Sequence, residues 1–258
     1  MNSIPTTLID KLHHPDHNER SAAVFELDRL DNAAKLSVLI QALRTDPDLY
    51  VREDLTYAIM NMGSLAVAPL MTLLNDEDAQ IRHHAAHTLG KIGDASAVDA
   101  LTNALQDSNA ALVVQKVIFA LGQIGDAAAV PALVALVGHT ERTVQTALIT
   151  VLEHFGDSAV PLLLQAMQHE RWQVREQAAD ILGGIGDAAA LPSLIDALQD
   201  DQWQVRFAAV TALGHLGSDA AHNALRNLPD DPEPKINDLI TRLLKPRTGA
   251  SKRLNFTL

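Results

Sequence analysis

The sequence predicts an all-α solenoid, a right-handed superhelix of about seven helix pairs. A glycine-containing segment recurs with a period near 31 residues, a spacing typical of repeat proteins built from paired helices. Within each period the apolar residues lie three and four positions apart, as they do on one face of a helix. Hydrophobic residues make up 47% of the chain and aromatic residues only 3%, so Ala, Leu and Val dominate, which favours closely packed helices over strands.

The repeated segment is clearest at residues 89–107, LGKIGDASAVDALTNALQD. Each period predicts a first helix such as 97–105, a turn such as 76–80 and a second helix such as 81–92. A glycine then ends the second helix in a left-handed conformation, and the following Asp caps the next helix. The second glycine of each copy falls at Gly63, Gly93, Gly125, Gly156, Gly186 and Gly217.

The repeats are expected to form one solenoid over residues 1–244. The more polar helices predicted at 6–13 and 235–244 would cap its two ends, because a repeat stack needs a polar outer face there. The tail 245–258, KPRTGASKRLNFTL, turns basic and polar and is expected to be disordered.

The pattern VRxxAAxxLGxIGD, preceded by DxxxxVR, resembles the HEAT-like repeats first noted in phycobilin lyases, over roughly residues 12–228. The resemblance implies an armadillo-like helical fold whose second helices line the inner, concave face. It also implies that the repeat arginine binds a carboxylate of the neighbouring turn, for example Asp94 or Asp187. Val114 and Gln145 replace that arginine in two repeats. The arginine positions are Arg20, Arg52, Arg82, Arg175 and Arg206.

Composition excludes several classes of function. The net charge of −12 would repel a phosphate backbone, so we expect no nucleic-acid partner. The absence of cysteine excludes disulfides, thiolate catalysis and cysteine-based zinc sites. No apolar run is long enough to span a bilayer and the N-terminal segment lacks a signal-peptide core, so we expect an acidic, cytoplasmic protein that binds no membrane.

The repeat also indicates which side chains face outward. With the repeat arginine as position zero, positions +3, +4 and +7 are nearly always apolar and should be buried. Positions +1, +5 and +9 vary in kind and lie on one stripe of the second helix, which should be exposed. The predicted partner-binding residues on this stripe are Phe25, Glu53, Tyr57, His83, His87, Lys91, Phe119, Glu176, Asp180 and Phe207.

Two histidines on this stripe, His83 and His87, are four residues apart, a spacing at which a helix can present both to one metal ion. Glu53, one repeat earlier, could complete such a site. The deoxyhypusine hydroxylases, a related HEAT-like family, carry His-Glu pairs directly after the repeat arginine, and no repeat here does so. We therefore expect no metal site and no cofactor, with His83, His87 and Glu53 kept as the candidates if a metal does bind.

The sequence is best explained by a non-catalytic scaffold that binds a protein or peptide on its concave face. The partner should carry apolar side chains and an acidic group opposite His83, His87 and Lys91, in a contact that weakens as pH rises through the histidine range. The alternative is a phycobilin-lyase-like or deoxyhypusine-hydroxylase-like protein that holds a tetrapyrrole or a metal in the groove. No phosphate-binding loop or Ser-His-Asp context favours another enzyme.

Overall fold

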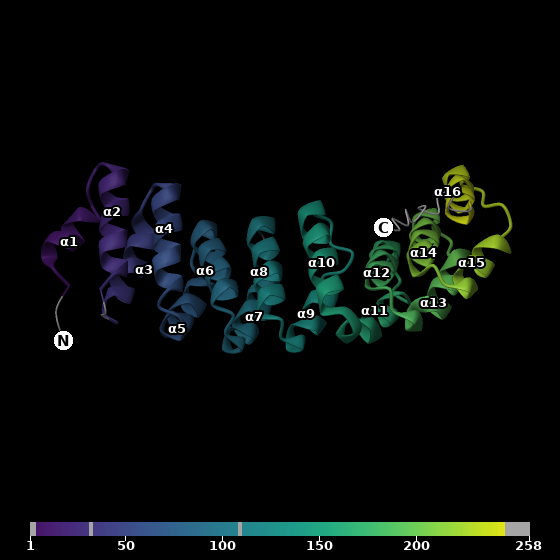
Figure 1. Cartoon of the computed structure of the whole chain (residues 1–258), viewed down its shortest axis with the longest axis horizontal. Helices are drawn as coiled ribbons and strands as arrows, with labels where there is room; N and C mark the ends of the chain where they lie inside the picture. Colours follow the sequence, from purple (N-terminus) through teal and green to yellow (C-terminus); the bar gives the residue numbers. More distant parts are fainter. Residues whose placement is uncertain (1–3, 31–32, 108–109, 246–258) are drawn as a thin grey trace, which may run out of the picture. The chain divides into compact units, whose positions relative to one another are not determined.

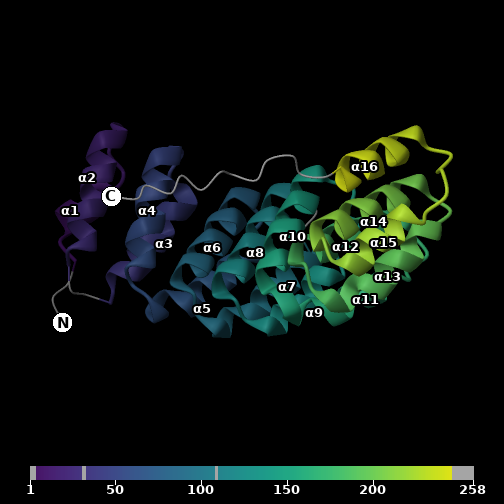
Figure 2. The same ribbon diagram turned by 45° about the vertical axis from the view of Figure 1, so that its right-hand side comes forward.

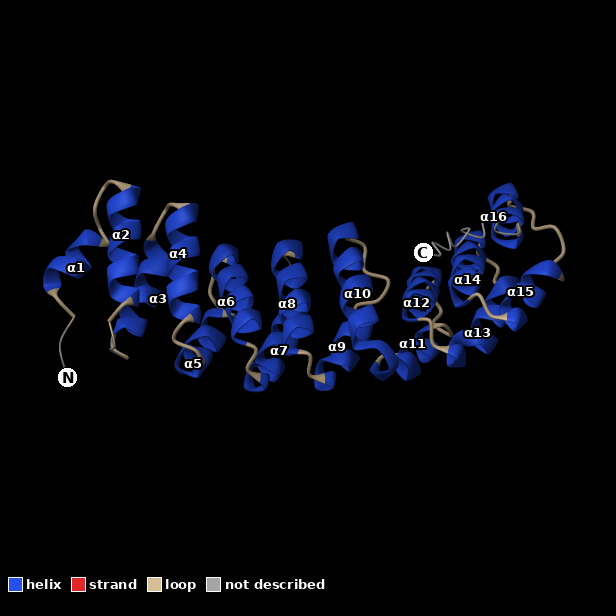
Figure 3. Cartoon of the chain, viewed as in Figure 1, coloured by secondary structure: helices blue, strands red, loops and turns tan. Residues whose placement is uncertain are grey.

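The computed structural model describes residues 4–30, 33–107 and 110–245. Within these ranges the chain forms sixteen α-helices and no strand (Figure 3). The chain divides into two compact units, Met1–Ser158 and Ala159–Leu258, and each unit is described by itself.

The first unit holds five helix pairs. In each pair an odd-numbered first helix precedes an even-numbered second helix, and consecutive second helices lie side by side in one layer (Figures 1 and 2). The helices are α1 Thr6–Lys11, α2 His17–Asp28, α3 Lys35–Thr45, α4 Leu49–Met60, α5 Ser64–Leu73, α6 Ala79–Ile92, α7 Val98–Asp107, α8 Ala111–Ile124, α9 Val130–Val134 and α10 Arg142–Phe155.

The second unit holds three pairs built in the same way. Its second helices again pack on one another, α12 on α14 and α14 on α16. The helices are α11 Val160–Ala166, α12 Trp172–Ile185, α13 Leu191–Asp196, α14 Trp203–Leu216, α15 Asp219–Arg226 and α16 Pro234–Leu244. Short 3-10 turns occur in both units, at η1 Ala95–Ala97, η2 Ala127–Ala129 and η3 Gly156–Ser158 in the first and at η4 Ala188–Ala190 and η5 Ala197–Gln199 in the second.

These stacked pairs confirm the predicted all-α solenoid. The described helices make eight pairs where about seven were expected, because the terminal helix α16 packs on α15 as the second member of a pair. The handedness of the superhelix and its continuity over residues 1–244 stay predictions. The tail expected to be disordered lies outside the described residues from 246 onward.

The predicted left-handed glycine is observed at four of the six positions, Gly93, Gly125, Gly186 and Gly217. Gly63 and Gly156 instead have positive φ with ψ −134° and −131°, and α4 already ends at Met60. Gly93 ends α6 with φ 74° and ψ 20°, the left-handed conformation that a residue with a Cβ adopts only at a cost. Asp94 follows in extended conformation, and its carboxylate accepts a hydrogen bond from the Ser96 N–H. This GD pair therefore closes a second helix and starts the next first helix, which produces the chain reversal between them.

Second helices approach one another closely where a glycine lies on the shared face. A Cβ added to Gly90 of α6 would lie 2.7 Å from Cα of Ala120 in α8, and one added to Gly183 of α12 would lie 2.6 Å from Cα of Ala212 in α14. Such contacts admit no larger side chain without moving the helices apart. The paired small residues therefore fix the spacing of the layer.

The repeat arginines are structural, but the expected partner was wrong. Arg20 binds Asp46 with two hydrogen bonds, Nε to Oδ2 at 2.7 Å and Nη2 to Oδ1 at 3.1 Å. Arg175 and Arg206 bind the equivalent residues of the next repeat in the same way. The carboxylate comes from the turn between the two helices of the next pair, whereas Asp94 caps a helix.

The carboxylate of Asp187, the other expected partner, is also used as a helix cap, by Ala189 N–H. A second interaction joins each arginine to its own repeat, since Arg20 Nη1 also donates to the carbonyl oxygens of His14 and Pro15. Gln145, which replaces the arginine in one repeat, still donates from Nε2 to the His139 carbonyl oxygen at 2.6 Å. The substitution therefore keeps the bond within the repeat.

Removing the Asp46 carboxylate should destabilise the chain strongly. The Arg20 and Asp46 side chains are 9% and 4% exposed, so Asp46→Ala would leave a buried guanidinium without its counter-charge. We expect the free energy of unfolding, measured by urea denaturation, to fall by about 3–5 kcal/mol. The matched control is Glu26→Ala, which breaks the exposed Lys11–Glu26 pair and should cost under about 1 kcal/mol. Equal losses in the two variants would mean that the arginine contacts do not hold the repeats together.

Candidate functional site

The predicted outward stripe is solvent-accessible throughout. At positions +1, +5 and +9 of the seven repeats aligned on the arginine, every side chain is exposed or half-buried. Phe25 is 50% exposed and Tyr57 is 57% exposed, whereas Phe119 and Phe207 are half-buried. The stripe thus presents large apolar side chains to solvent, as an interaction surface does.

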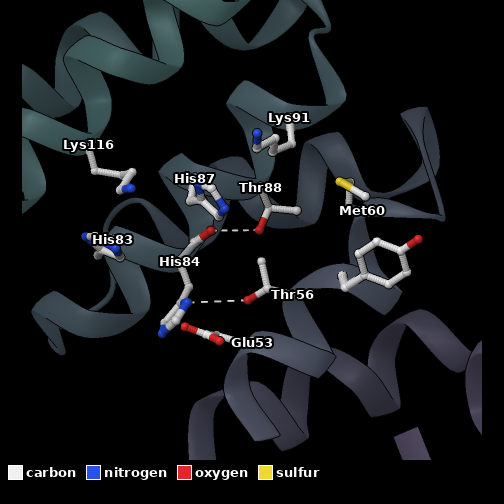
Figure 4. Close-up of a pocket in the computed structure, with 10 residues that line it drawn as sticks. Glu53, Thr56, Met60, His83, His84, His87, Thr88, Lys91 and Lys116 are labelled. Atoms are coloured by element: carbon white, nitrogen blue, oxygen red, sulfur yellow. Dashed lines mark hydrogen bonds between the residues drawn. The ribbon is translucent and has the colours of Figure 1, made fainter. Parts of the chain in front are cut away.

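Half of the predicted site residues meet at one place. A hollow of about 520 Å³ lies on the first unit between α4, α6 and α8, and Figure 4 shows its lining. Five predicted residues line it, namely Glu53, Tyr57, His83, His87 and Lys91. Five further residues complete it, namely Thr56, Met60, His84, Thr88 and Lys116.

The other predicted residues do not line this hollow. Phe25 on α2 and Phe119 on α8 belong to the same unit and the same stripe. Glu176, Asp180 and Phe207 belong to the second unit. Burial, and then the neighbouring charge of Asp180, raise the pKa of Glu176.

The hollow lies at a helix whose repeat glycine is replaced. Met60 in α4 stands at the position that Gly90 has in α6 and Gly122 has in α8. Helix α6 packs more extensively on α8 than on α4. The Met60 side chain lines the hollow where α4 and α6 pack less extensively.

The deepest residue of the hollow, His84, is held in one protonation state. The Thr56 hydroxyl donates its proton to the Arg52 carbonyl oxygen at 2.7 Å, so it can only accept from Nδ1 of His84, 3.3 Å away. His84 is only 5% exposed. Burial, followed by the positive groups around it, lowers the pKa of His84 to about 4. The ring is therefore neutral at pH 7, with its proton on Nδ1 and a lone pair on Nε2.

Two imidazole nitrogens of this cluster are buried without a partner. Within the described residues, His83 Nδ1 and His84 Nε2 have no hydrogen bond, although the two rings meet edge to face with centroids 5.6 Å apart. A buried polar atom left unpaired costs about 1–3 kcal/mol. Such atoms are few in folded proteins, and a water, an ion or a ligand can complete them.

The histidines supply less positive charge than the sequence suggested. Burial, followed by the positive charge of Lys116, lowers the pKa of both His83 and His87. A contact that depends on imidazolium charge would therefore titrate below the ordinary histidine range. At neutral pH the positive charge of the hollow comes from Lys91 and Lys116.

The arrangement is a poor match for a metal ion. Among the described residues no group of three or more His, Asp or Glu side chains is placed to hold one. Lys91 and Lys116 line the same hollow as His83 and His87, and their ammonium groups would repel a cation. Glu53 lines the hollow as well, but it does not join the two histidines in a ligand set.

Sequence reasoning missed the residues that shape the hollow. Position +2 of the second helices should have drawn attention, because it holds Asp54, His84 and Lys116 in succession although it borders the buried stripe. The exchange of the repeat glycine for Met60 was a second signal. Neither signal predicts how deeply the His84 side chain is buried, because its burial depends on packing between neighbouring helices.

Acid should destabilise the chain through His84. The unfolded histidine has a pKa near 6.5 and the folded one about 4, so between these values the unfolded chain binds a proton that the folded chain refuses. Stability should therefore fall as pH drops from about 6.5 to 4, by about 2–3 kcal/mol from this group. His84→Asn can still donate to Thr56 but cannot titrate, so urea midpoints measured across this range should fall less steeply.

The control for that measurement is His215→Asn, which replaces an exposed histidine of the second unit and should keep the steep profile. A wild-type profile that stays flat between pH 6.5 and 4 would contradict the burial of a neutral His84.

Metal content is expected to be low. Protein purified without a histidine tag should contain well under one equivalent of iron or zinc by elemental analysis, since lysines share the hollow with the histidines. Stoichiometric metal that disappears in a His83→Ala/His87→Ala double variant would overturn this expectation.

Comparison with solved structures gives the fold a wider context. A search of curated proteins found no match. A chain in the structure of Kap95p bound to RanGDP is 17% identical with a TM-score of 0.62, over 92% of this chain and 39% of that one. The structure of importin beta in an ammonium sulfate condition is 16% identical with a TM-score of 0.60, over 92% of this chain and 38% of that one. This chain thus spans about two-fifths of either.

A chain of the phycocyanin lyase complex from a Nostoc species is 23% identical with a TM-score of 0.45, over 95% of this chain and 96% of that one. No described helix is long and apolar enough to cross a membrane.

A family model of HEAT repeats matches residues 5–72, 36–118, 67–153, 113–171 and 160–245, which together span nearly the whole chain. The chain therefore belongs to the HEAT-repeat family.

Proposed function

We propose that this chain is a non-catalytic scaffold that binds a protein or peptide on the second-helix surface of its first unit, the face expected to be concave in HEAT repeats. The observation that carries the proposal is the register of three aromatic side chains. Phe25, Tyr57 and Phe119 occupy the same position of α2, α4 and α8. The Phe25 side chain is 50% exposed and that of Tyr57 is 57% exposed. Only nine aromatic residues occur in the chain, so their placement on this stripe is a strong bias.

Physical reasons favour such a row as a binding surface. An aromatic ring buries a large apolar area while it loses few rotamers, so it contributes affinity at low entropic cost. The second helices beneath these rings pack directly on one another, α2 on α4, α4 on α6 and α6 on α8. A partner would therefore meet rings held at fixed spacing, which reduces the cost of ordering the surface.

The fold itself is compatible with this function. The structure of Kap95p with RanGDP shows that a solenoid of similar fold binds a protein partner, which is an analogy at the level of fold only. The lack of cysteine suits the reducing cytoplasm, where we place the protein.

A tetrapyrrole or metal in the groove is the alternative function. The ammonium groups of Lys91 and Lys116 disfavour a metal ion in the hollow. An absorbance scan of protein purified from its source cells distinguishes the two functions, because a bound chromophore absorbs visible light and a peptide does not.

Truncating an aromatic side chain of the row should weaken the complex. After a partner is isolated with the wild-type chain, Tyr57→Ala or Phe119→Ala should cost about 1–3 kcal/mol of binding free energy by titration calorimetry. The matched control is Tyr50→Ala, which removes a 73% exposed tyrosine from the first turn of the same helix α4.

Folding is checked in the same variants. Tyr57→Ala should unfold within a few tenths of a kcal/mol of wild type, because a 57% exposed ring contributes little to the core. A Tyr57→Ala variant that unfolds much more easily and binds the partner normally would show that the stripe is part of the core.

A further inference from the structure

The hollow between α4, α6 and α8 is a basic site in an acidic protein. Four of its lining residues carry or can carry positive charge, and a single carboxylate, that of Glu53, lines it (Figure 4). The whole chain has a net charge of −12, so this local balance is opposite to that of the rest of the molecule. The four basic residues are His83, His87, Lys91 and Lys116.

The two lysines are not neutralised within the protein. In the part of the chain that the structure describes, ion pairs form at Lys11, Arg20, Lys35, Arg44, Arg175 and Arg206. None forms at Lys91 or Lys116, so no described carboxylate oxygen lies within 4.0 Å of either ammonium group. Burial, and then the positive charge of Lys91, lower the pKa of Lys116.

Among the described residues, the histidines of the hollow keep two ring nitrogens without a partner, Nδ1 of His83 and Nε2 of His84. The single ring N–H of neutral His84, on Nδ1, donates to the Thr56 hydroxyl, so the ring can offer a ligand only the lone pair on Nε2. His83 and His87 lie on the wall that faces Lys116, one helical turn apart. An incoming anion would reduce the mutual repulsion of these groups, because it supplies the counter-charge that they lack.

We propose that this hollow binds one oxyanion, a carboxylate or a phosphate group, carried by the protein or peptide that occupies the second-helix surface. Lys91 and Lys116 provide the charge, and His83 and His87 accept a proton as the anion enters. The inference rests on the proposed function and adds the chemistry of one contact to it.

The position of the hollow connects it to the aromatic row. Tyr57 is a member of the row and also lines the hollow. At about 520 Å³ the hollow is much larger than one carboxylate or phosphate group, so the chain that carries the anion must fill the remainder. A partner segment with an anionic side chain beside an apolar one satisfies both features.

The proposal can be tested on the isolated protein with two small probes. The ring proton resonances of the histidines are followed by NMR across pH, with inorganic phosphate or sodium acetate added and the ionic strength held constant with sodium chloride. We expect saturable shifts at His83 and His87 and a rise in the pKa of both histidines, because a bound anion favours the imidazolium form. The probe that saturates at the lower concentration identifies the preferred oxyanion.

Variants link these shifts to the hollow. In a Lys91→Gln/Lys116→Gln double variant the apparent affinity for the better probe should fall at least about ten-fold. Lys11→Gln is the matched control, since Lys11 already pairs with Glu26 and does not line the hollow, and it should bind the probe as wild type does.

Three results would overturn the proposal: no saturable shift with either probe, an equal shift with sodium chloride alone, or an equal loss in Lys11→Gln. Two variants distinguish a failure of the oxyanion site from a failure of the proposed function. Phe25→Ala, which truncates the aromatic row at a side chain that does not line the hollow, should keep probe binding even where it loses the partner. If the double lysine variant binds the isolated partner as tightly as wild type, the aromatic row stands and the oxyanion site falls.

Discussion

The close approach of consecutive second helices is the constraint on which this structure depends. A helix pair cannot bury its apolar face alone, so each pair must pack on the next. Gly90 against Ala120 and Gly183 against Ala212 bring the helices so near that an added Cβ would collide with backbone. Met60 replaces the glycine in α4, which packs less extensively on α6 than α6 does on α8, and its side chain lines the hollow. The candidate site thus lies where this close approach is missing.

Charge is handled in two different ways along the same helices. Three repeat arginines are matched with carboxylates of the next repeat, and these pairs join one repeat to another. Lys91 and Lys116 have no such partner, and the histidines beside them are kept neutral by burial and by the lysines. These arginine pairs therefore serve the fold, whereas Lys91 and Lys116 lie on the surface that we assign to binding.

Much of the fold could be predicted from the sequence because its signals are local. Gly93 and Asp94 specify a helix end and the next helix start by their own conformational preferences, and the apolar spacing separates the buried stripe from the outer one. The partner of Arg20 could not be predicted, since Asp46 lies 26 residues away in sequence and reaches it only after two pairs have stacked. Asp94 and Asp187 were expected from the family resemblance.

The site was predicted less completely for the same reason. His83, His87 and Lys91 were found because they share one helix, whereas Lys116 comes from the next second helix and depends on how closely α6 and α8 pack. The low pKa of His84 depends on burial between helices, which no single repeat reveals.

The central claim is that the second-helix surface of the first unit is where a partner binds. Site-specific photo-crosslinking in the source cells tests it most directly, with a benzophenone amino acid placed at Tyr57 on α4 or at Leu65 on α5. Both positions are well exposed, at 57% and 60%, but they belong to different layers. The account predicts one defined protein crosslinked from Tyr57 and none from Leu65. Crosslinks from Leu65 alone, or equal products from both positions, would contradict it.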